Sequence, residues 1–81
     1  MDRLEKIIGI IRKVGELTID KDFEITGDTD IVGELNFDSI DMVMIVGEIE
    51  ENFGITIEND MVQEIRTVND LNQKVGQLLG E

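Results

Sequence analysis

The stretch that decides the fold runs from Asp38 to Phe53 and reads DSIDMVMIVGEIEENF. Asp38 is a good N-cap at its start, and Gly54 stands where a glycine commonly ends a helix. We therefore expect a helix over Ser39–Asn52 that packs one face against a core. The apolar residues of that face follow the i, i+3, i+4, i+7 spacing of an amphipathic helix: Met42, Ile45, Val46, Ile49 and Phe53.

This helix is predicted to be apolar on a second side as well. Ile40, Val43, Met44 and Gly47 form another stripe that begins beside Ser39. A surface helix of a bundle needs only one apolar face. The second stripe fits either a central helix buried on all sides or an exposed surface. Exposed apolar residues that are rimmed by acids usually mark a place where a partner binds.

The rest of the chain predicts three more helices. An amphipathic helix is expected over Asp2–Glu16, followed by a long connection over Leu17–Phe37. A short helix is expected over Asn59–Ile65, and a last helix over Val68–Leu79, for which Thr67 is the cap. Together these elements predict an all-α fold: a four-helix bundle with three main helices, a short third helix and a long loop between helices one and two. We expect residues 1–81 to form a single domain.

The long connection is unusual for a compact domain, because most loops are much shorter. Its glycines and aspartates are typical of turns and argue against a sheet, although Phe23–Thr26 alternates as a strand would. We expect its apolar residues to hold it across the bundle: Ile19, Phe23, Ile25, Ile31, Val32 and Leu35.

The chain is strongly acidic, with a net charge of −12 from 19 acidic and 7 basic residues. No basic residue lies between Asp22 and Ile65, a stretch that holds 13 of the 19 acids. Such a surface repels nucleic acid and anionic membranes and attracts basic protein surfaces. The sequence also contains no signal-peptide pattern and no apolar run long enough to span a membrane. We therefore expect a cytoplasmic, monomeric protein that binds neither nucleic acid nor membrane.

Residue types argue against catalysis. The chain has no histidine, cysteine or tyrosine, which excludes Ser-His-Asp and Cys-His arrangements. The segment Asp28–Gly33 begins like an EF-hand calcium loop, but position five is Val32 and position twelve is Ser39 instead of a glutamate. We therefore predict neither an enzyme nor a specific metal site.

Ser39 is the only serine in the chain. It can be an ordinary helix cap, but Asp38 can cap the helix equally well and leave Ser39 at the first helical position with its hydroxyl outward. A hydroxyl at a helix N-terminus is well placed to carry a phosphodiester, because the free N–H groups and the helix dipole favour an anion there.

The tetrapeptide at positions 38–41, DSID, resembles the Asp-Ser-Leu-Asp motif of acyl carrier proteins, with isoleucine in place of leucine. The similarity extends over Asp38–Phe53, the family's second helix, and over Arg66–Leu71, the entry to its last helix. It covers roughly the chain from Asp30 to the C-terminus. This resemblance implies a carrier on which a phosphopantetheinyl transferase attaches 4'-phosphopantetheine to Ser39.

The resemblance also implies what the carrier does. The thiol of the arm holds acyl groups as thioesters and presents them to synthases, transferases or ligases with basic surfaces, in fatty-acid or specialised lipid or polyketide synthesis. A D-alanyl or peptidyl carrier, or an unmodified acidic interaction module, remains an alternative. The residues expected to dock these enzymes are Asp38, Ile40, Asp41, Val43, Met44, Glu48 and Glu51.

Four positions depart from the pattern of housekeeping members of the family. Met44 stands where a glutamate is usual, and Gly47 stands where a methionine is usual. Glu58 replaces a common proline, and Phe37 is bulky where the family is often small. These departures leave the predicted class unchanged but make a specialised pathway plausible.

Overall fold

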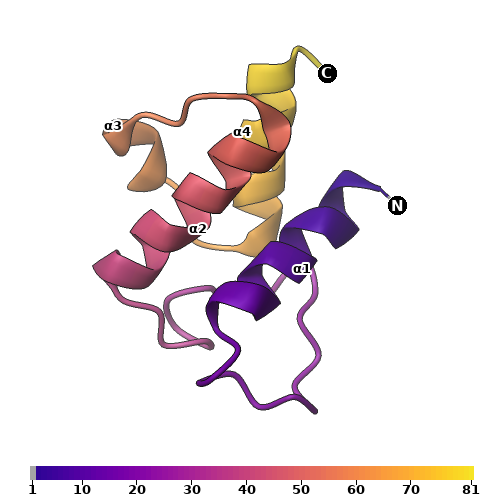
Figure 1. Cartoon of the computed structure of the whole chain (residues 1–81), viewed down its shortest axis with the longest axis vertical. Coiled ribbons are helices and arrows are strands. Elements are labelled where there is room, and N and C mark those ends of the chain that lie inside the picture. Colours follow the sequence, from indigo (N-terminus) through magenta and orange to yellow (C-terminus); the bar gives the residue numbers. More distant parts are fainter. Residues whose placement is uncertain (1) are drawn as a thin grey trace.

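A computed structural model describes residues 2–81 as a helical bundle (Figure 1). Residues 2–81 contain no strand, only an isolated antiparallel bridge between Asp30 and Thr67. The predicted all-α bundle, with three main helices, a short third helix and a long first loop, is confirmed. None of the helices described is long and apolar enough to cross a membrane. The helices are α1 (Arg3–Val14), α2 (Ser39–Phe53), α3 (Asn59–Val62) and α4 (Val68–Leu79).

The helix boundaries differ from the predicted ones at three of the four elements. α1 is shorter than predicted at both ends, because Asp2 is its N-cap and Gly15 ends it. α3 is three residues shorter than predicted. After Val62 the N–H groups of Glu64 and Ile65 donate to carbonyls only three residues back, at 3.1 Å each, which is a tight turn rather than an α-helix. α2 extends one residue beyond its predicted end, and α4 matches its prediction.

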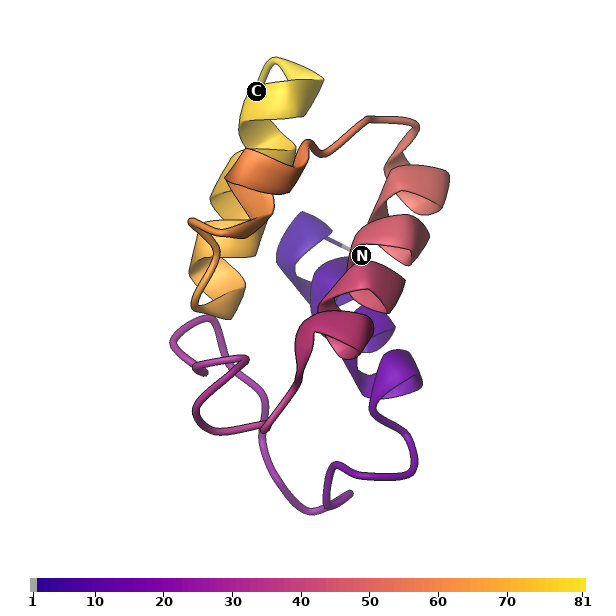
Figure 2. The ribbon, with the colours of Figure 1, turned by 90° about the vertical axis from the view of Figure 1, so that its left-hand side faces the viewer.

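The core lies where the apolar faces of the three main helices meet. α1 packs against both α2 (Figure 1) and α4, and Figure 2 shows its ribbon between theirs. Branched aliphatic residues dominate this core, so that the predicted first face of α2 is largely buried. The buried apolar side chains of the three helices are those of Ile7, Ile10, Ile11, Met42, Ile45, Ile49, Val68, Leu71 and Val75.

The long connection is held to the bundle by apolar side chains, as expected, with one exception. Ile25, Ile31 and Leu35 are buried, and Ile19 and Phe23 pack partly against the core. The prediction for Val32 is wrong, because its side chain is 49% exposed. Val32 lies in a turn directly after the buried Ile31, where the chain turns away from the core.

Phe37 fixes the end of the connection directly before α2. Its side chain is 3% exposed, so that it is part of the core. The ring lies against Gly15 at the end of α1, where an added Cβ atom would come within 2.7 Å of it. A bulky residue before the 38–41 tetrapeptide is therefore accommodated by the glycine that ends α1. This contact anchors the chain to the core directly before α2.

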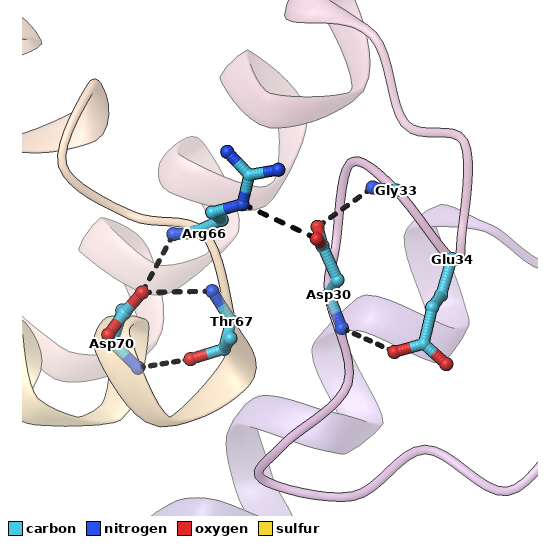
Figure 3. A network of polar contacts seen from close by, with 6 residues as sticks. All are labelled: Asp30, Gly33, Glu34, Arg66, Thr67 and Asp70. Atoms are coloured by element: carbon cyan, nitrogen blue, oxygen red, sulfur yellow. Dashed lines mark hydrogen bonds and ion pairs between the residues drawn. The ribbon is translucent and has the colours of Figure 1, made fainter.

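Polar contacts tie the same connection to the start of α4 (Figure 3). The Asp30 carboxylate accepts the N–H of Gly33 at 2.8 Å and lies 3.4 Å from Nε of Arg66. The N–H of Ile31 donates to the carbonyl of Arg66 at 2.9 Å. The hydrogen bond from Gly33 and the charge of Arg66 lower the pKa of the Asp30 carboxyl. Asp30, which belongs to the EF-hand-like segment, thus serves to close a turn.

A reciprocal capping box begins α4 in the same network. The Thr67 hydroxyl oxygen accepts the N–H of Asp70 at 3.1 Å. The Asp70 carboxylate in turn accepts the N–H groups of Thr67 and Arg66 at 3.0 Å each. These two backbone hydrogen bonds lower the pKa of the Asp70 carboxyl.

Candidate functional site

The start of α2 is closed by two aspartates that cap each other's backbone. The Asp38 carboxylate accepts the N–H of Asp41 at 2.9 Å, and the Asp41 carboxylate accepts the N–H of Asp38 at 3.1 Å. This is a capping box in which aspartate replaces the usual glutamate. The sequence predicts Asp38 as the cap, but the part of Asp41 in the box was missed. The spacing of three residues was the signal that could have found it.

Ser39 is the first residue of α2, and its side chain is exposed. Asp38 already satisfies the N–H of Asp41, so that the Ser39 hydroxyl is not needed to cap the helix. The position and the exposure of Ser39 are those that the sequence predicts.

A groove with a volume of about 600 Å³ opens beside Ser39, between α2 and the segment that contains α3. Most of its wall is apolar, with one side supplied by α2 and the other by the α3 segment. Polar groups from Glu50, Asn59 and Gln63 complete the wall. The groove therefore gives an apolar surface that starts at the Ser39 side chain. Its apolar side chains are Met42, Val43, Val46, Ile57 and Val62.

The residues around Ser39 fit a phosphopantetheine arm at both of its ends. The first turn of α2 favours the phosphodiester anion through its N–H groups and its dipole. The apolar groove allows the rest of the arm, or an acyl chain on it, to leave water. Asp38 and Asp41 flank Ser39, so that the helix N-terminus would have to offset the repulsion between their carboxylates and a phosphate attached there.

The second apolar stripe of α2 is a surface. The side chains of Ile40, Val43 and Met44 are exposed to 68%, 70% and 49%. The alternative interpretation, a central helix buried on all sides, is therefore wrong. We call these three residues the docking patch.

The acids predicted to dock partners surround this patch but differ in their surroundings. Asp38 and Glu51 are exposed, and Asp41 is half-buried. Glu48 is half-buried and forms an ion pair with Nζ of Lys13 on α1 at 3.3 Å. Glu48 therefore joins two helices, and its charge is partly neutralised before any partner arrives.

The sequence predictions missed Glu50 and the groove residues of the α3 segment, which are Ile57, Asn59, Val62 and Gln63. The carboxylate of Glu50 accepts the N–H of Ile57 at 2.8 Å and so connects the end of α2 to the segment before α3. This hydrogen bond joins the two walls of the groove. The spacing of Glu50 from Val43 and Val46, seven and four residues, places it on the groove side of α2 but does not indicate its hydrogen bond with Ile57.

Comparison with known families gives a match over most of the chain. The family described as "Phosphopantetheine attachment site" matches residues 5–75. An acyl carrier protein of Coprothermobacter proteolyticus is 34% identical over 68 residues, which are 83% of this chain and 83% of that protein. A chloroplastic acyl carrier protein of Hordeum vulgare is 34% identical over 80 residues, but these span only 60% of its length.

Solved structures with similar folds agree with this match. An acyl carrier protein of Thermotoga maritima superimposes with a TM-score of 0.73 and 31% identity, covering 95% of this chain and 91% of that one. A Mycobacterium tuberculosis protein provisionally identified as an acyl carrier protein reaches a TM-score of 0.81 at 30% identity, covering 91% and 95%. This chain therefore belongs to the acyl carrier proteins, which are carriers rather than enzymes and hold acyl groups on a covalently attached 4'-phosphopantetheine.

Proposed function

We propose that Ser39 is the residue that bears the 4'-phosphopantetheine. One observation carries this proposal. The only serine of the chain is exposed at the first position of α2 and lines an apolar groove, and its hydroxyl is not needed as a cap because Asp38 caps the helix. A phosphopantetheinyl transferase would join the arm of coenzyme A to the Ser39 hydroxyl as a phosphodiester. The thiol of the arm then carries the acyl group as a thioester.

In this proposal the protein's own residues shield and present that thioester. The groove beside Ser39 covers apolar parts of the arm and its acyl group. The docking patch gives short-range apolar contacts to acyl synthases, transferases or ligases. Asp38, Asp41 and Glu51 attract the basic surfaces of these enzymes. Such charges raise the rate of association more than the affinity, which suits a carrier that visits many enzymes in turn.

The comparisons favour acyl groups over D-alanyl or peptidyl cargo, because the relatives are acyl carrier proteins. We propose a role in fatty-acid or specialised lipid or polyketide synthesis. The docking patch supports a specialised role, because Met44 adds an apolar side chain while Gly47 leaves a gap. The monomeric state stays a prediction. The cytoplasmic location also stays a prediction, since chloroplastic proteins are among the relatives.

The intact mass of the purified protein tests the Ser39 assignment. After incubation with coenzyme A and a broad-specificity phosphopantetheinyl transferase, we expect one added arm that maps to Ser39. The Ser39→Ala variant should stay folded and gain no mass, because Asp38 still caps α2. A known carrier, modified in parallel, shows that the transferase is active. Modification of Ser39→Ala, or no added mass on the folded wild-type protein, would contradict the proposal.

A further inference from the structure

Gly47 lies in the interior of α2, where a glycine is less stable than alanine and the fold gives no reason for it. It is exposed, and a Cβ atom added to it would meet no heavy atom within 4 Å. In contrast, Gly15, Gly27 and Gly76 each have a neighbour that a Cβ atom would hit. Packing within the chain therefore explains those three glycines but not Gly47.

Gly47 is the point at which two hollows on opposite sides of α2 meet. It lines the groove of about 600 Å³ on the α3 side. It also lines a second hollow of about 390 Å³ on the α1 side, together with Lys13, Met44 and Glu51. Figure 1 shows α3 and α1 on the two sides of α2. The missing side chain thus lowers the ridge of α2 between the two hollows.

The surroundings of this low point indicate what it receives. On a helix surface the neighbours of Gly47 are the residues three and four positions away, which here are Val43, Met44, Glu50 and Glu51. The first two are exposed apolar side chains, and the last two are acids. We call Gly47 with these four residues the Gly47 notch. An apolar side chain that projects from a basic surface complements both its shape and its charge.

An enzyme that acts at Ser39 reaches this notch. Eight residues of α-helix separate Ser39 from Gly47, a rise of about 12 Å. A weak encounter buries up to about 600 Å² on each partner, which is a disc that reaches roughly 14 Å from its centre. A footprint centred on Ser39 therefore extends to Gly47 when it follows α2.

Building on the proposed carrier function, we propose that Gly47 is a specificity-determining residue of the docking surface. The enzymes that serve this carrier, its phosphopantetheinyl transferase included, place an apolar side chain of a basic surface into the Gly47 notch. The open space at Gly47 selects partners with such a projecting side chain. It disfavours flat surfaces, which would leave the notch unfilled.

The test uses the full chain, coenzyme A and the phosphopantetheinyl transferase of the source organism. The initial rate of Ser39 modification is measured against carrier concentration, so that kcat and KM are separated. We expect Gly47→Leu to raise KM by at least about tenfold with kcat within about twofold of wild type, because its side chain occupies the notch. Gly47→Ala, which fills less of the space, should raise KM by about two- to threefold.

Gly9→Ala is the matched control. Gly9 also lies in the interior of a long helix, is exposed, and has no heavy atom within 4 Å of an added Cβ, but it lies on α1. Both alanine variants should raise Tm by about 4 °C or more, because alanine is the better helix former. Only the Gly47 variant should change KM.

The outcomes separate the notch from the carrier function. A KM for Gly47→Leu equal to or below that of wild type would overturn the proposed role of the Gly47 notch. That result is expected if partners bind a plain apolar patch, because an added apolar side chain would then strengthen binding. In that case Ser39 modification of the wild-type protein would still support the carrier. A wild-type chain that is folded but never modified would overturn both.

Discussion

The starts of α2 and α4 are closed by the same device but serve different purposes. Each has a reciprocal capping box with aspartate at the third position: Asp38 with Asp41 in α2, and Thr67 with Asp70 in α4. In α4 the first helical residue, Val68, is fully buried, whereas in α2 the equivalent residue is the exposed Ser39. The box therefore secures a helix start in both places, and the residue after it decides whether that start belongs to the core or to the surface.

The surroundings of the two boxes differ in the same way. The α4 box is part of a network in which Asp30 and Arg66 hold the long connection against the bundle (Figure 3). The α2 box has only its own two carboxylates to cap it, and an open groove lies beside it. Because Asp38 caps α2, the Ser39 hydroxyl stays exposed, as the proposed modification requires.

Alanine at the first helical position should abolish modification when it is placed in α2 and reduce stability when it is placed in α4. Ser39→Ala is expected to abolish modification while changing the free energy of unfolding by less than about 0.5 kcal/mol. Val68→Ala should leave modification of the folded protein intact and reduce the free energy of unfolding by about 2 kcal/mol, since it opens a cavity in the core. Urea unfolding and intact mass, measured on both variants, check this.

The outcome that would break the comparison is specific. If Ser39→Ala destabilised the protein as much as Val68→Ala, the Ser39 hydroxyl would be a structural group and α2 would resemble α4. Far-ultraviolet circular dichroism of both variants verifies that the helices are retained.

Removing the capping side chain of either helix should lower the free energy of unfolding by less than Val68→Ala does. Thr67→Ala is expected to lower the free energy of unfolding by about 1 kcal/mol, since it leaves the N–H of Asp70 without its acceptor. Asp38→Ala should cost about 0.5 kcal/mol, because the lost cap is partly offset by the removal of one charge from the acidic region. High salt should narrow the difference between the two variants. An Asp38→Ala variant that is less stable than Thr67→Ala at low salt would contradict this account.

The bounds of the helices could be predicted from the sequence more accurately than the contacts that their side chains make. Periodicity and capping residues located α4 to the residue and α2 to within one, because both signals are local in the chain. α3 was predicted too long, since Val62 to Ile65 keeps an apolar spacing but closes into tight turns.

Apart from the part of Asp41 in the α2 box, which is local, the contacts of the site that were missed join a helix to another segment. The pairing of Glu50 with Ile57 and that of Lys13 with Glu48 cannot be found from spacing alone. Ser39 could be predicted because its signal, a lone serine after a capping aspartate, is contained in two adjacent residues.

Acid should weaken the α4 box in a measurable way. The pKa of Asp70 is lowered below its ordinary value of 3.8 by the N–H groups of Thr67 and Arg66. A carboxyl whose pKa is lower in the folded state stabilises the fold above its unfolded pKa, and this stabilisation is lost as the pH falls through the folded pKa. Between pH values of about 5 and 2, wild type should therefore lose more stability than Asp70→Asn, which has no such proton to bind.

Asp22→Asn provides the control for this measurement, because it removes one exposed carboxylate outside the network. The free energy of unfolding is measured by urea titration at several pH values for all three proteins. Parallel pH dependences of wild type and Asp70→Asn would show that the box does not depend on the charge of Asp70.

Ionic strength should have the smallest effect on stability. Its effect depends on the charges near each helix start, which differ between α2 and α4. The α2 box lies in the stretch of 13 acids without a base, whereas Arg66 and Lys74 accompany the α4 box. Raising the ionic strength shortens the Debye length from about 30 Å at 0.01 M to about 8 Å at 0.15 M, which screens repulsion among exposed carboxylates. We expect Tm to rise by roughly 2–4 °C over this range, and MgCl₂ to act at least as strongly as NaCl. Because the Asp38→Ala variant lacks one of the repelling charges, its Tm should rise less than that of wild type. A Tm that is indifferent to salt in both proteins would mean that the acids of α2 are already spaced widely enough not to repel one another.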